Sequence, residues 1–415
     1  MKKSRLIAAL AAAGLTLALG GCSGDSDSGS GGSVTIKFAH WGNNEEAKTI
    51  ASMIAAFQQA NPTIKVQDNW IQADYQQKLT TSVAGGQAPD VAQTSNAFLA
   101  DFQSAFQPVQ VDPSAYYAPN IPNALKVGDQ YYGVPFVIKP KVMAINLGLF
   151  KKGGVPAPSL TQPMTVDQFV ATAKKLTSGT GKAKVYGSAP LWFNGWLVAE
   201  GGDFFSADGQ ACTLDTPAAL ATANLMIEAQ ASDGFAPTLL AAQGQDMFYW
   251  LSVDRLAMQP DFGPWDIAKL AGLKSGDFQI LPVPGNGSQL EVNGIAISKS
   301  AKDSKLSAAQ KFAAFMSTDD RAQSLLTTTK SSLGVPVTST GLKSFEAAAP
   351  DLNLKAFVTA AGQSKLGASV KKYGQITGNI GEALSSKTAI GSGKQDPATV
   401  LSDLQKRCPA GLTTG

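Results

Sequence analysis

The chain has 415 residues, of which 44% are hydrophobic and 16% are charged, and its formal net charge is +3. This length exceeds one ordinary hydrophobic core and predicts two lobes. The small net charge gives no electrostatic footprint for nucleic acid, which normally needs a clustered basic face, so we expect no nucleic-acid partner.

The first 21 residues predict a secretory signal peptide that ends before Cys22. Three basic side chains precede an apolar run over residues 6–19, and two glycines separate that run from the cysteine. The run is shorter than the ~20 apolar residues that a membrane-spanning helix needs. Removal of residues 1–21 takes the three basic side chains away and leaves a mature chain with balanced charge.

Small residues directly before Cys22 resemble the lipobox of bacterial lipoproteins, in which that cysteine carries the lipid. Residues 22–33 are rich in Ser, Gly and Asp, cannot bury a core, and predict a lipidated flexible tether. The alternative is a plain signal peptide followed by an incidental cysteine. We expect attachment to the membrane through the lipid anchor only, on the extracytoplasmic face of the cell membrane.

Strand and helix patterns alternate after the tether. Strand periodicity at 34–38 and 64–66 alternates with helical spacing over 50–57 and 75–83, and a third strand begins near Val91. This alternation is typical of parallel α/β sheets, in which ligands lie beyond the carboxyl ends of the strands.

The same alternation continues in the second half of the chain. A capping-box sequence begins at Thr165, while Thr216 and Asp396 each precede a proline and predict helix N-caps. Apolar stretches within 280–297 predict further strands. Because no linker divides the body cleanly, we expect a chain that crosses between its lobes several times.

Two cysteines, Cys212 and Cys408, remain once Cys22 is assigned to the lipid. An even number of cysteines in an exported chain permits one disulfide, which would tie the C-terminal segment to the middle of the chain. The sequence does not show whether the two positions meet, so two free thiols stay an alternative.

Several short motifs occur in the order that they have in one protein family. They are 86–91 (GQAPDV), 132–135 (YGVP), 143–150 (MAINLGLF), 165–169 (TVDQF), 201–202 (GG) and 257–265 (AMQPDFGPW). In this order they resemble the extracellular solute-binding proteins of ABC importers, especially the carbohydrate-binding group that includes maltose-binding protein. The likeness runs from about Val34 to about Leu404.

The resemblance implies an α/β, periplasmic-binding-protein-like fold with two lobes, each a mixed sheet flanked by helices, joined by hinge strands and closing over ligand. The lobe boundaries expected by analogy are 34–139 plus 294–336 for lobe I and 140–293 plus 337–415 for lobe II. The expected crossings lie near 137–141, 292–295 and 335–338.

In function, the resemblance implies a lipid-anchored protein that captures a sugar or oligosaccharide and delivers it to the transmembrane permease subunits of an ABC transporter. We expect a monomer that needs no cofactor and no metal and catalyses no reaction. The alternatives are a non-sugar solute such as an amino acid or polyamine, and a secreted carbohydrate-active enzyme.

Sugar recognition needs aromatic faces for the apolar side of a pyranose and polar groups for its hydroxyls. Trp41 and Trp192 stand beside turns and are candidate ligand platforms, with core packing as the alternative. The resemblance implies that Trp265 faces the ligand. For the other tryptophans core packing is favoured: Trp70, Trp196 and Trp250.

Seven polar residues are candidate ligand contacts because they lie at strand ends, at crossings or in a late polar stretch: Asn44, Glu45, Thr94, Asn96, Lys139, Asn293 and Tyr373. Asn44 and Glu45 could instead cap the helix that follows them, and Asn293 could instead shape a turn. Lys139 stands where maltose-binding protein places a carboxylate, and this departure leaves the identity of the solute open.

Catalytic arrangements find little support in the composition. His40 is the single histidine, so a Ser-His-Asp or Cys-His arrangement would have to use it, and a buried structural role fits it better. One histidine and two mature cysteines cannot build a His-rich or Cys-rich metal site. Composition alone does not exclude a glycosidase with paired carboxylates, although no pair stands out.

Overall fold

The computed structural model describes residues 33–231, 233–273, 277–327, 333–368, 370–385 and 396–408. The chain divides into two units after Gly32, and everything below concerns the second unit, Ser33–Gly415. The expected signal peptide, Cys22 and nearly all of the tether lie outside the described residues. Within the described residues, no helix is both long enough and apolar enough to cross a membrane.

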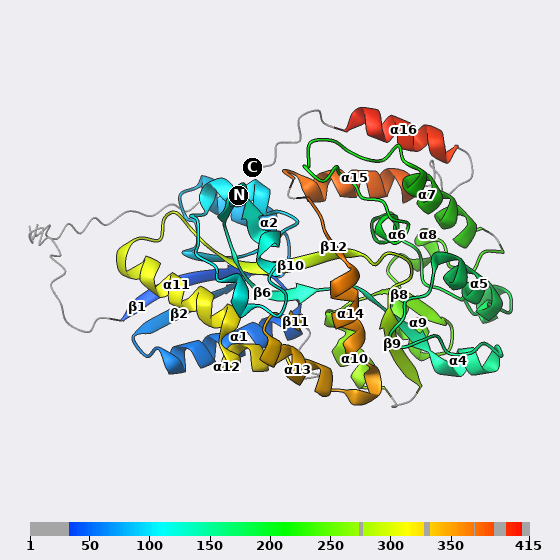
Figure 1. The fold of residues 1–415 in the computed structure, drawn as a ribbon, viewed down its shortest axis with the longest axis horizontal. Coiled ribbons are helices and arrows are strands. Elements are labelled where there is room, and N and C mark those ends of the chain that lie inside the picture. Colours follow the sequence, from blue (N-terminus) through cyan, green and yellow to red (C-terminus); the bar gives the residue numbers. More distant parts are fainter. Residues whose placement is uncertain are drawn as a thin grey trace, which may run out of the picture. The chain divides into compact units, whose positions relative to one another are not determined.

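Seven strands form the larger sheet in the order β11-β6-β10-β3-β1-β2, with β12 paired to β10 (Figure 1). They are β1 (Val34–His40), β2 (Ile64–Trp70), β3 (Val91–Ser95), β6 (Val134–Lys139), β10 (Gln289–Ile297), β11 (Val335–Pro336) and β12 (Lys365–Leu366). β1 runs parallel to β2 and β3, whereas β10 runs antiparallel to β3 and β6. The sheet is therefore mixed.

Helices α1 (Asn44–Ala60) and α11 (Asp303–Thr318) pack on one face of this sheet. Ile36 and Phe38 of β1 are fully buried there, together with Phe57 of α1 and Phe312 of α11. Alternate residues of a strand point to the same face, so the periodicity at 34–38 predicted this buried row and is confirmed.

Three strands form the smaller sheet in the order β8-β7-β9: β7 (Val142–Asn146), β8 (Met258–Phe262) and β9 (Phe278–Pro282). These strands pair antiparallel, and a parallel bridge between Tyr186 and Leu256 adjoins β8. Phe169, Phe204 and Phe235 are nearly solvent-free in the core beside this sheet. The fold is the expected two-lobed α/β fold.

The chain passes between the two sheets in short segments. β6 ends at Lys139 and β7 begins at Val142, so two residues join the sheets at this crossing. The return lies between Pro282 of β9 and Gln289 of β10, because β10 already pairs with β6 from Glu291 onward. The expected second crossing near 292–295 thus falls inside a strand of the larger sheet.

The remaining elements complete the two lobes and carry the helix caps that the sequence indicates. They are β4 (Lys126–Val127), β5 (Gln130–Tyr131), α2 (Tyr75–Ala84), α3 (Leu99–Phe102), α4 (Leu147–Lys152), α5 (Val166–Leu176), α6 (Phe193–Ala199), α7 (Pro217–Ala229), α8 (Leu239–Ala242), α9 (Met247–Ser252), α10 (Ile267–Ala271), α12 (Asp320–Ser324), α13 (Ser339–Ala347), α14 (Lys355–Gln363), α15 (Tyr373–Ser385) and α16 (Pro397–Arg407). Thr165 caps α5 in a capping box, Thr216 caps α7, and Asp396 caps α16. All three caps are confirmed.

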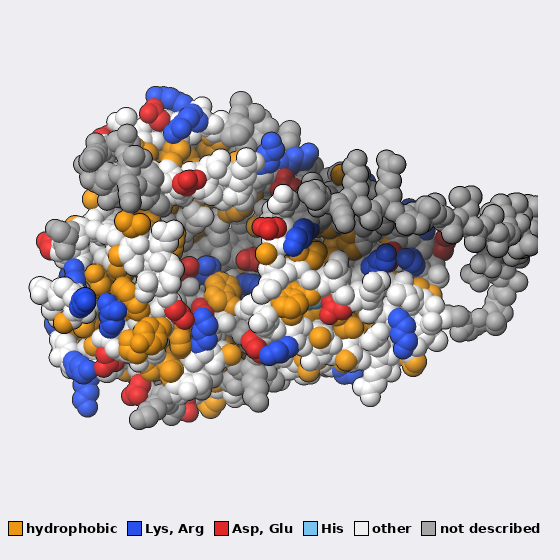
Figure 2. Space-filling model, turned by 180° about the vertical axis from the view of Figure 1, so that it is seen from behind, with side chains coloured by type: hydrophobic (Ala, Val, Ile, Leu, Met, Phe, Trp, Pro, Cys, Tyr) orange, Lys and Arg blue, Asp and Glu red, His pale blue; other side chains and the backbone are white. Residues whose placement is uncertain are grey.

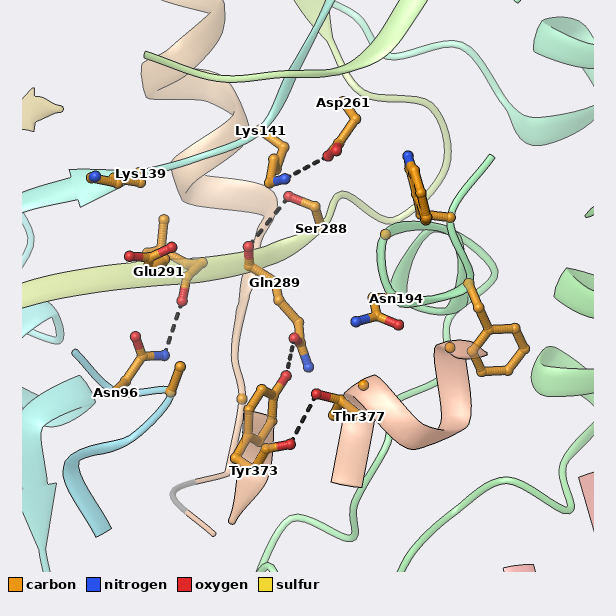
Figure 3. Close-up of a pocket in the computed structure, with 18 of the residues that line it drawn as sticks. Asn96, Lys139, Lys141, Asn194, Asp261, Ser288, Gln289, Glu291, Tyr373 and Thr377 are labelled. Atoms are coloured by element: carbon orange, nitrogen blue, oxygen red, sulfur yellow. Dashed lines mark hydrogen bonds and ion pairs between the residues drawn. The ribbon is translucent and has the colours of Figure 1, made fainter. Parts of the chain in front are cut away.

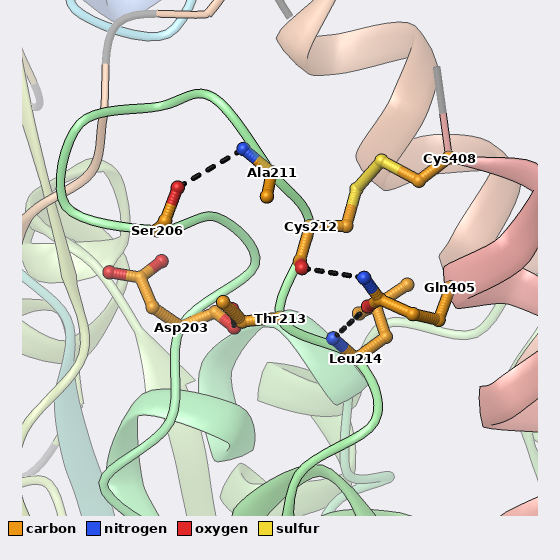
Figure 4. The surroundings of a disulfide bond; sticks show 8 residues. All are labelled: Asp203, Ser206, Ala211, Cys212, Thr213, Leu214, Gln405 and Cys408. Atoms are coloured by element: carbon orange, nitrogen blue, oxygen red, sulfur yellow. Dashed lines mark hydrogen bonds between the residues drawn. A yellow bond between two sulfur atoms is a disulfide. The ribbon is translucent and has the colours of Figure 1, made fainter. Parts of the chain in front are cut away.

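A disulfide joins Cys212 to Cys408, the residue that follows α16 (Figure 4). Beside the disulfide, the Gln405 side-chain amide makes two hydrogen bonds to the backbone near Cys212. Its Nε2 donates to the Cys212 carbonyl at 2.7 Å, and its Oε1 accepts from the Leu214 N–H at 2.7 Å. The C-terminal helix is therefore fixed to the middle of the chain by one covalent link and two hydrogen bonds.

Replacement of both Cys212 and Cys408 by serine is expected to lower the free energy of unfolding by about 2–5 kcal/mol, because the bond spans 196 residues of sequence and restricts the unfolded chain. Urea denaturation checks the value. Wild-type protein unfolded in reductant serves as the control and should match the variant. Thiol titration of denatured, unreduced protein that finds both thiols free would contradict the bond.

Candidate functional site

A cavity of about 570 Å³ opens between segments of the two lobes (Figure 3). It is bounded by the residues after β3, by the crossing after β6, by the start of α6, by Asp261 of β8, by the start of β10 and by α15. Figure 2 shows acidic and basic side chains gathered around a hollow in one face of the molecule. Segments far apart in the sequence thus converge on one concave site.

Two further hollows adjoin this central cavity. One, of about 590 Å³, is bounded by Trp41, Tyr75 and Phe98, and it shares Ala97 and Glu291 with the central cavity. The other, of about 760 Å³, adjoins α8, and its residues in common with the central cavity are Trp192, Asp261 and Glu382. Because neighbouring hollows share walls, we treat the three as one continuous groove.

Trp192 is the aromatic side chain most open to this groove. It stands at the N-cap position of α6 and is 49% exposed, although it lines both the central cavity and the hollow beside α8. Phe193, the next residue, is buried against Phe204 and anchors the start of the helix. One turn further, Trp196 is buried and its ring lies 4.6 Å from that of Phe169. Trp192 therefore borders the groove, whereas Trp196 packs in the core, which is the alternative that the sequence favoured for Trp196.

Trp41 lies at the opposite end of the groove. It follows β1 directly and is half-buried, with its ring centroid 5.0 Å from that of Tyr75 and 5.3 Å from that of Phe98. Its backbone N–H donates to Gln93 Oε1 at 3.3 Å. Trp41 thus forms part of an aromatic wall.

Trp265 does not line any of the three hollows, although the resemblance implied a ligand-facing ring. Its ring packs over Gly263, where an added Cβ would come within 2.3 Å of ring atoms, so only glycine permits this packing. The Lys141 ammonium lies 5.1 Å from the centroid of the same ring and 2.5 Å from Asp261 Oδ1. Trp265 therefore supports Lys141, which does line the cavity.

The residue that caps α1 lies one position before Asn44, the first of the two residues expected to cap this helix. Asn43, not Asn44, caps α1, and Glu46 completes the capping box by accepting from the Asn43 N–H at 2.7 Å. Asn44 and Glu45 are exposed and do not line the hollows, and Glu45 instead pairs with Lys48 at 2.8 Å. Asn44 and Glu45 therefore lie outside the three hollows, and Glu46 is the carboxylate of this turn that is buried, in contact with Asn43 and Lys139.

Lys139 lines the central cavity with its charge already paired. Its Nζ lies 2.7 Å from Glu46 Oε1, and the two side chains are 6% and 8% exposed. An ion pair so deeply withdrawn from water is held by its hydrogen bonds, because each charge alone would be costly there. Lys139 thus presents a neutralised, fixed donor rather than a free cation.

Asn96 lines the cavity, whereas Thr94 and Asn293 lie behind it. The Asn96 amide donates to the Leu290 carbonyl at 3.0 Å and accepts from the Val292 N–H at 2.9 Å, so it extends the pairing of β3 with β10. Thr94 and Asn293 are fully buried in that pairing. Thr94 Oγ1 and both amide atoms of Asn293 have no hydrogen-bond partner within the described residues. Asn293 lies at an irregularity of β10 rather than in a turn.

Tyr373 lines the cavity from α15, and its hydroxyl donates to Gln289 Oε1. Burial raises the pKa of Tyr373; the hydrogen bond to Gln289 opposes this, and the carboxylates of Asp203 and Glu291 raise the pKa further. The phenol is therefore protonated at physiological pH and available as a hydrogen-bonding group.

Several residues of the cavity were not predicted: Lys141, Asn194, Asp261, Gln289, Glu291, Thr377 and Glu382. A signal existed for two of them, because Gln289, Glu291 and Asn293 alternate along a strand and therefore share one face. His40, in contrast, is fully buried and its Nε2 lies 2.8 Å from Asp68 Oδ1, which fits a structural role.

Residues 41–323 match the model of one protein family, described as bacterial extracellular solute-binding protein. An uncharacterized lipoprotein in the oleD 5' region of Streptomyces antibioticus is 33% identical over 186 residues, which cover 42% of this chain and 40% of the relative. The diacetylchitobiose binding protein DasA of Streptomyces coelicolor is 24% identical over 228 residues, or 50% of this chain and 51% of that protein. The chain thus matches about half or less of the length of these relatives.

Among solved structures, the chain is similar to an ABC substrate-binding protein of Listeria monocytogenes in complex with cycloalternan. The TM-score is 0.77 at 24% identity, and the superposition covers 90% of this chain and 97% of the other. A likeness at this level of identity shows a shared fold.

Proposed function

The chain belongs to the family of bacterial extracellular solute-binding proteins, and we propose that it captures a sugar or oligosaccharide in the groove between its lobes. It then delivers this solute to the permease of an ABC transporter, while a lipid on Cys22 retains it at the membrane. The relatives support this proposal, since one is named a lipoprotein, one a diacetylchitobiose binding protein, and one was solved with cycloalternan.

The observation that carries the proposal is the half-exposed ring of Trp192 inside a concave groove. Tryptophan is usually well buried, so a ring that is open to a groove has a face available for a ligand. The apolar C–H face of a pyranose stacks on such a ring. Asn194, Gln289 and Tyr373 line the same cavity and supply amide and hydroxyl groups that match sugar hydroxyls (Figure 3).

The length of the groove favours an oligosaccharide over a single small solute. The three hollows extend from Trp41 past Trp192 to α8, and each shares residues with its neighbour. A lone amino acid would occupy only part of this length. A chain of sugar units can occupy all of it, with one unit on each aromatic wall.

Binding is proposed to close the two lobes on each other, with the second boundary moved from 293/294 to the return between Pro282 and Gln289. Residues from both sheets line the central cavity, so a bound sugar would touch both lobes at once. A ligand that contacts both lobes stabilises the closed state by its additional contacts there. The permease would then recognise the closed, loaded state, and no catalytic step is required.

A panel of oligosaccharides is expected to contain at least one that raises the melting temperature Tm of the purified protein by several degrees. Saturation at 100 times Kd stabilises a folded protein by about 2.7 kcal/mol. Differential scanning fluorimetry measures the shift, with amino acids and polyamines as comparison solutes. If only amino acids or polyamines raise Tm, the proposal that the solute is a sugar is wrong. Release of reducing ends from any oligosaccharide would instead favour an enzyme.

A further inference from the structure

Glu291 has an unusual place in the groove. It is half-buried near the start of β10 and lines both the central cavity and the hollow beside Trp41. It stands opposite Lys139 in the pairing of β10 with β6, but the Lys139 ammonium is held by Glu46 at 2.7 Å. Within the described part of the chain, Glu291 forms no ion pair of its own. Its carboxylate is therefore left without an ion-pair partner among the residues that the structure describes.

The hollow beside Trp41 combines acidic and aromatic side chains. Asp74 and Glu291 are its charged wall residues, and neither Lys nor Arg occurs among the described residues that line it. The rings of Trp41, Tyr75 and Phe98 lie within 5.0–6.2 Å of one another. Aromatic faces attract cations through their quadrupole, and carboxylates attract them through charge. Both features of this hollow therefore favour a positively charged group.

Among the described residues that line it, the central cavity has no unpaired cation that would cancel this preference. Of its two lysines, Lys139 is paired with Glu46 and Lys141 lies 2.5 Å from Asp261 Oδ1. The raised pKa of Tyr373, caused first by burial and then also by the nearby carboxylates of Asp203 and Glu291, is consistent with a negative field in the cavity. The junction of the two hollows is therefore acidic.

We propose that the groove selects a saccharide that carries a protonated amine, and that Glu291 is the residue that accepts the N–H bonds of this amine. This inference rests on the proposed function, because it names the chemical class of the sugar. A carboxylate also accepts bonds from neutral hydroxyls, but a cation adds a charge–charge attraction that grows as the closing lobes withdraw Glu291 from water. A hydroxyl that donates to this carboxylate makes a hydrogen bond with one ionised partner, whereas an ammonium makes one in which both partners are ionised.

Three trisaccharides test the inference: β-1,4-linked glucans that differ only at carbon 2, with an amine, an N-acetyl group or a hydroxyl. Isothermal titration calorimetry at low ionic strength should show the amine form binding about tenfold more tightly than the other two. Glu291→Gln keeps the size of the side chain and removes its charge. This variant should lose the preference, with its affinity for the amine form falling about tenfold more than its affinity for the hydroxyl form.

Glu228→Gln is the matched control, because Glu228 lies exposed on α7, pairs with Lys174 and is absent from the groove. It should keep the full preference. Equal affinity of wild-type protein for all three sugars would overturn the inference and leave the proposed function standing. A preference that survives Glu291→Gln would remove Glu291 from its role. Binding of none of the three, nor of any other oligosaccharide, would overturn the proposed function and the inference together.

Discussion

Replacement of Trp192 by alanine is expected to weaken the affinity for the captured sugar by about 10- to 100-fold and to leave the fold intact. The ring is 49% exposed and lines two of the three hollows, so its loss removes ligand contact but little packing. Isothermal titration calorimetry with the sugar that raises Tm measures the change. An unchanged Tm of the free protein would show that the fold is preserved.

Tyr249→Ala is the matched control for this experiment. Tyr249 is 58% exposed on α9 and does not line the groove, so its loss removes an equally open aromatic side chain from a different surface. The affinity of this variant should match that of wild type. If Trp192→Ala and Tyr249→Ala bind sugar equally well, Trp192 is not a ligand platform and the observation behind the proposed function fails.

The sequence predicted the elements that depend on local pattern. The alternating residues Ile36 and Phe38, and the caps at Thr165 and Thr216, involve neighbours within four positions, so they are visible along the chain. The cap of α1 also has a local signal in the sequence. Asn43 and Glu46 have the spacing of a capping box, and this spacing predicts Asn43 as the cap rather than Asn44 or Glu45.

The charged contacts of the site depend on the fold and have no local signal. Lys139 is 93 positions from its partner Glu46, and Lys141 is 120 positions from Asp261. Trp265 illustrates the same limit, because the motif around it resembles a ligand-facing segment but its ring packs beside Lys141. Whether a side chain faces the cavity depends on contacts between segments that are distant in the sequence, and these contacts exist only in the folded protein.

The pair of Glu46 and Lys139 should matter more for stability than any other ion pair of the site. Lys139→Met is expected to lower the free energy of unfolding by about 3–5 kcal/mol, because it leaves the Glu46 carboxylate buried without a counter-charge. Both side chains are nearly solvent-free, and the Glu46 carboxylate also holds the N–H of Asn43 at the start of α1. Urea denaturation of the purified variants measures the loss.

Lys141→Met is the matched control, because Lys141 lies two residues away and its partner Asp261 is 45% exposed. Its loss should cost at most about 1 kcal/mol, as for solvent-screened pairs. The double variant Glu46→Gln with Lys139→Met should regain more than half of the stability, since the glutamine oxygen still accepts from Asn43 and no charge remains buried. If Lys139→Met costs no more than Lys141→Met, or if the double variant regains nothing, the buried pair does not fix α1 to the crossing after β6. In that event the position of Lys139 in the cavity must be set by backbone packing alone.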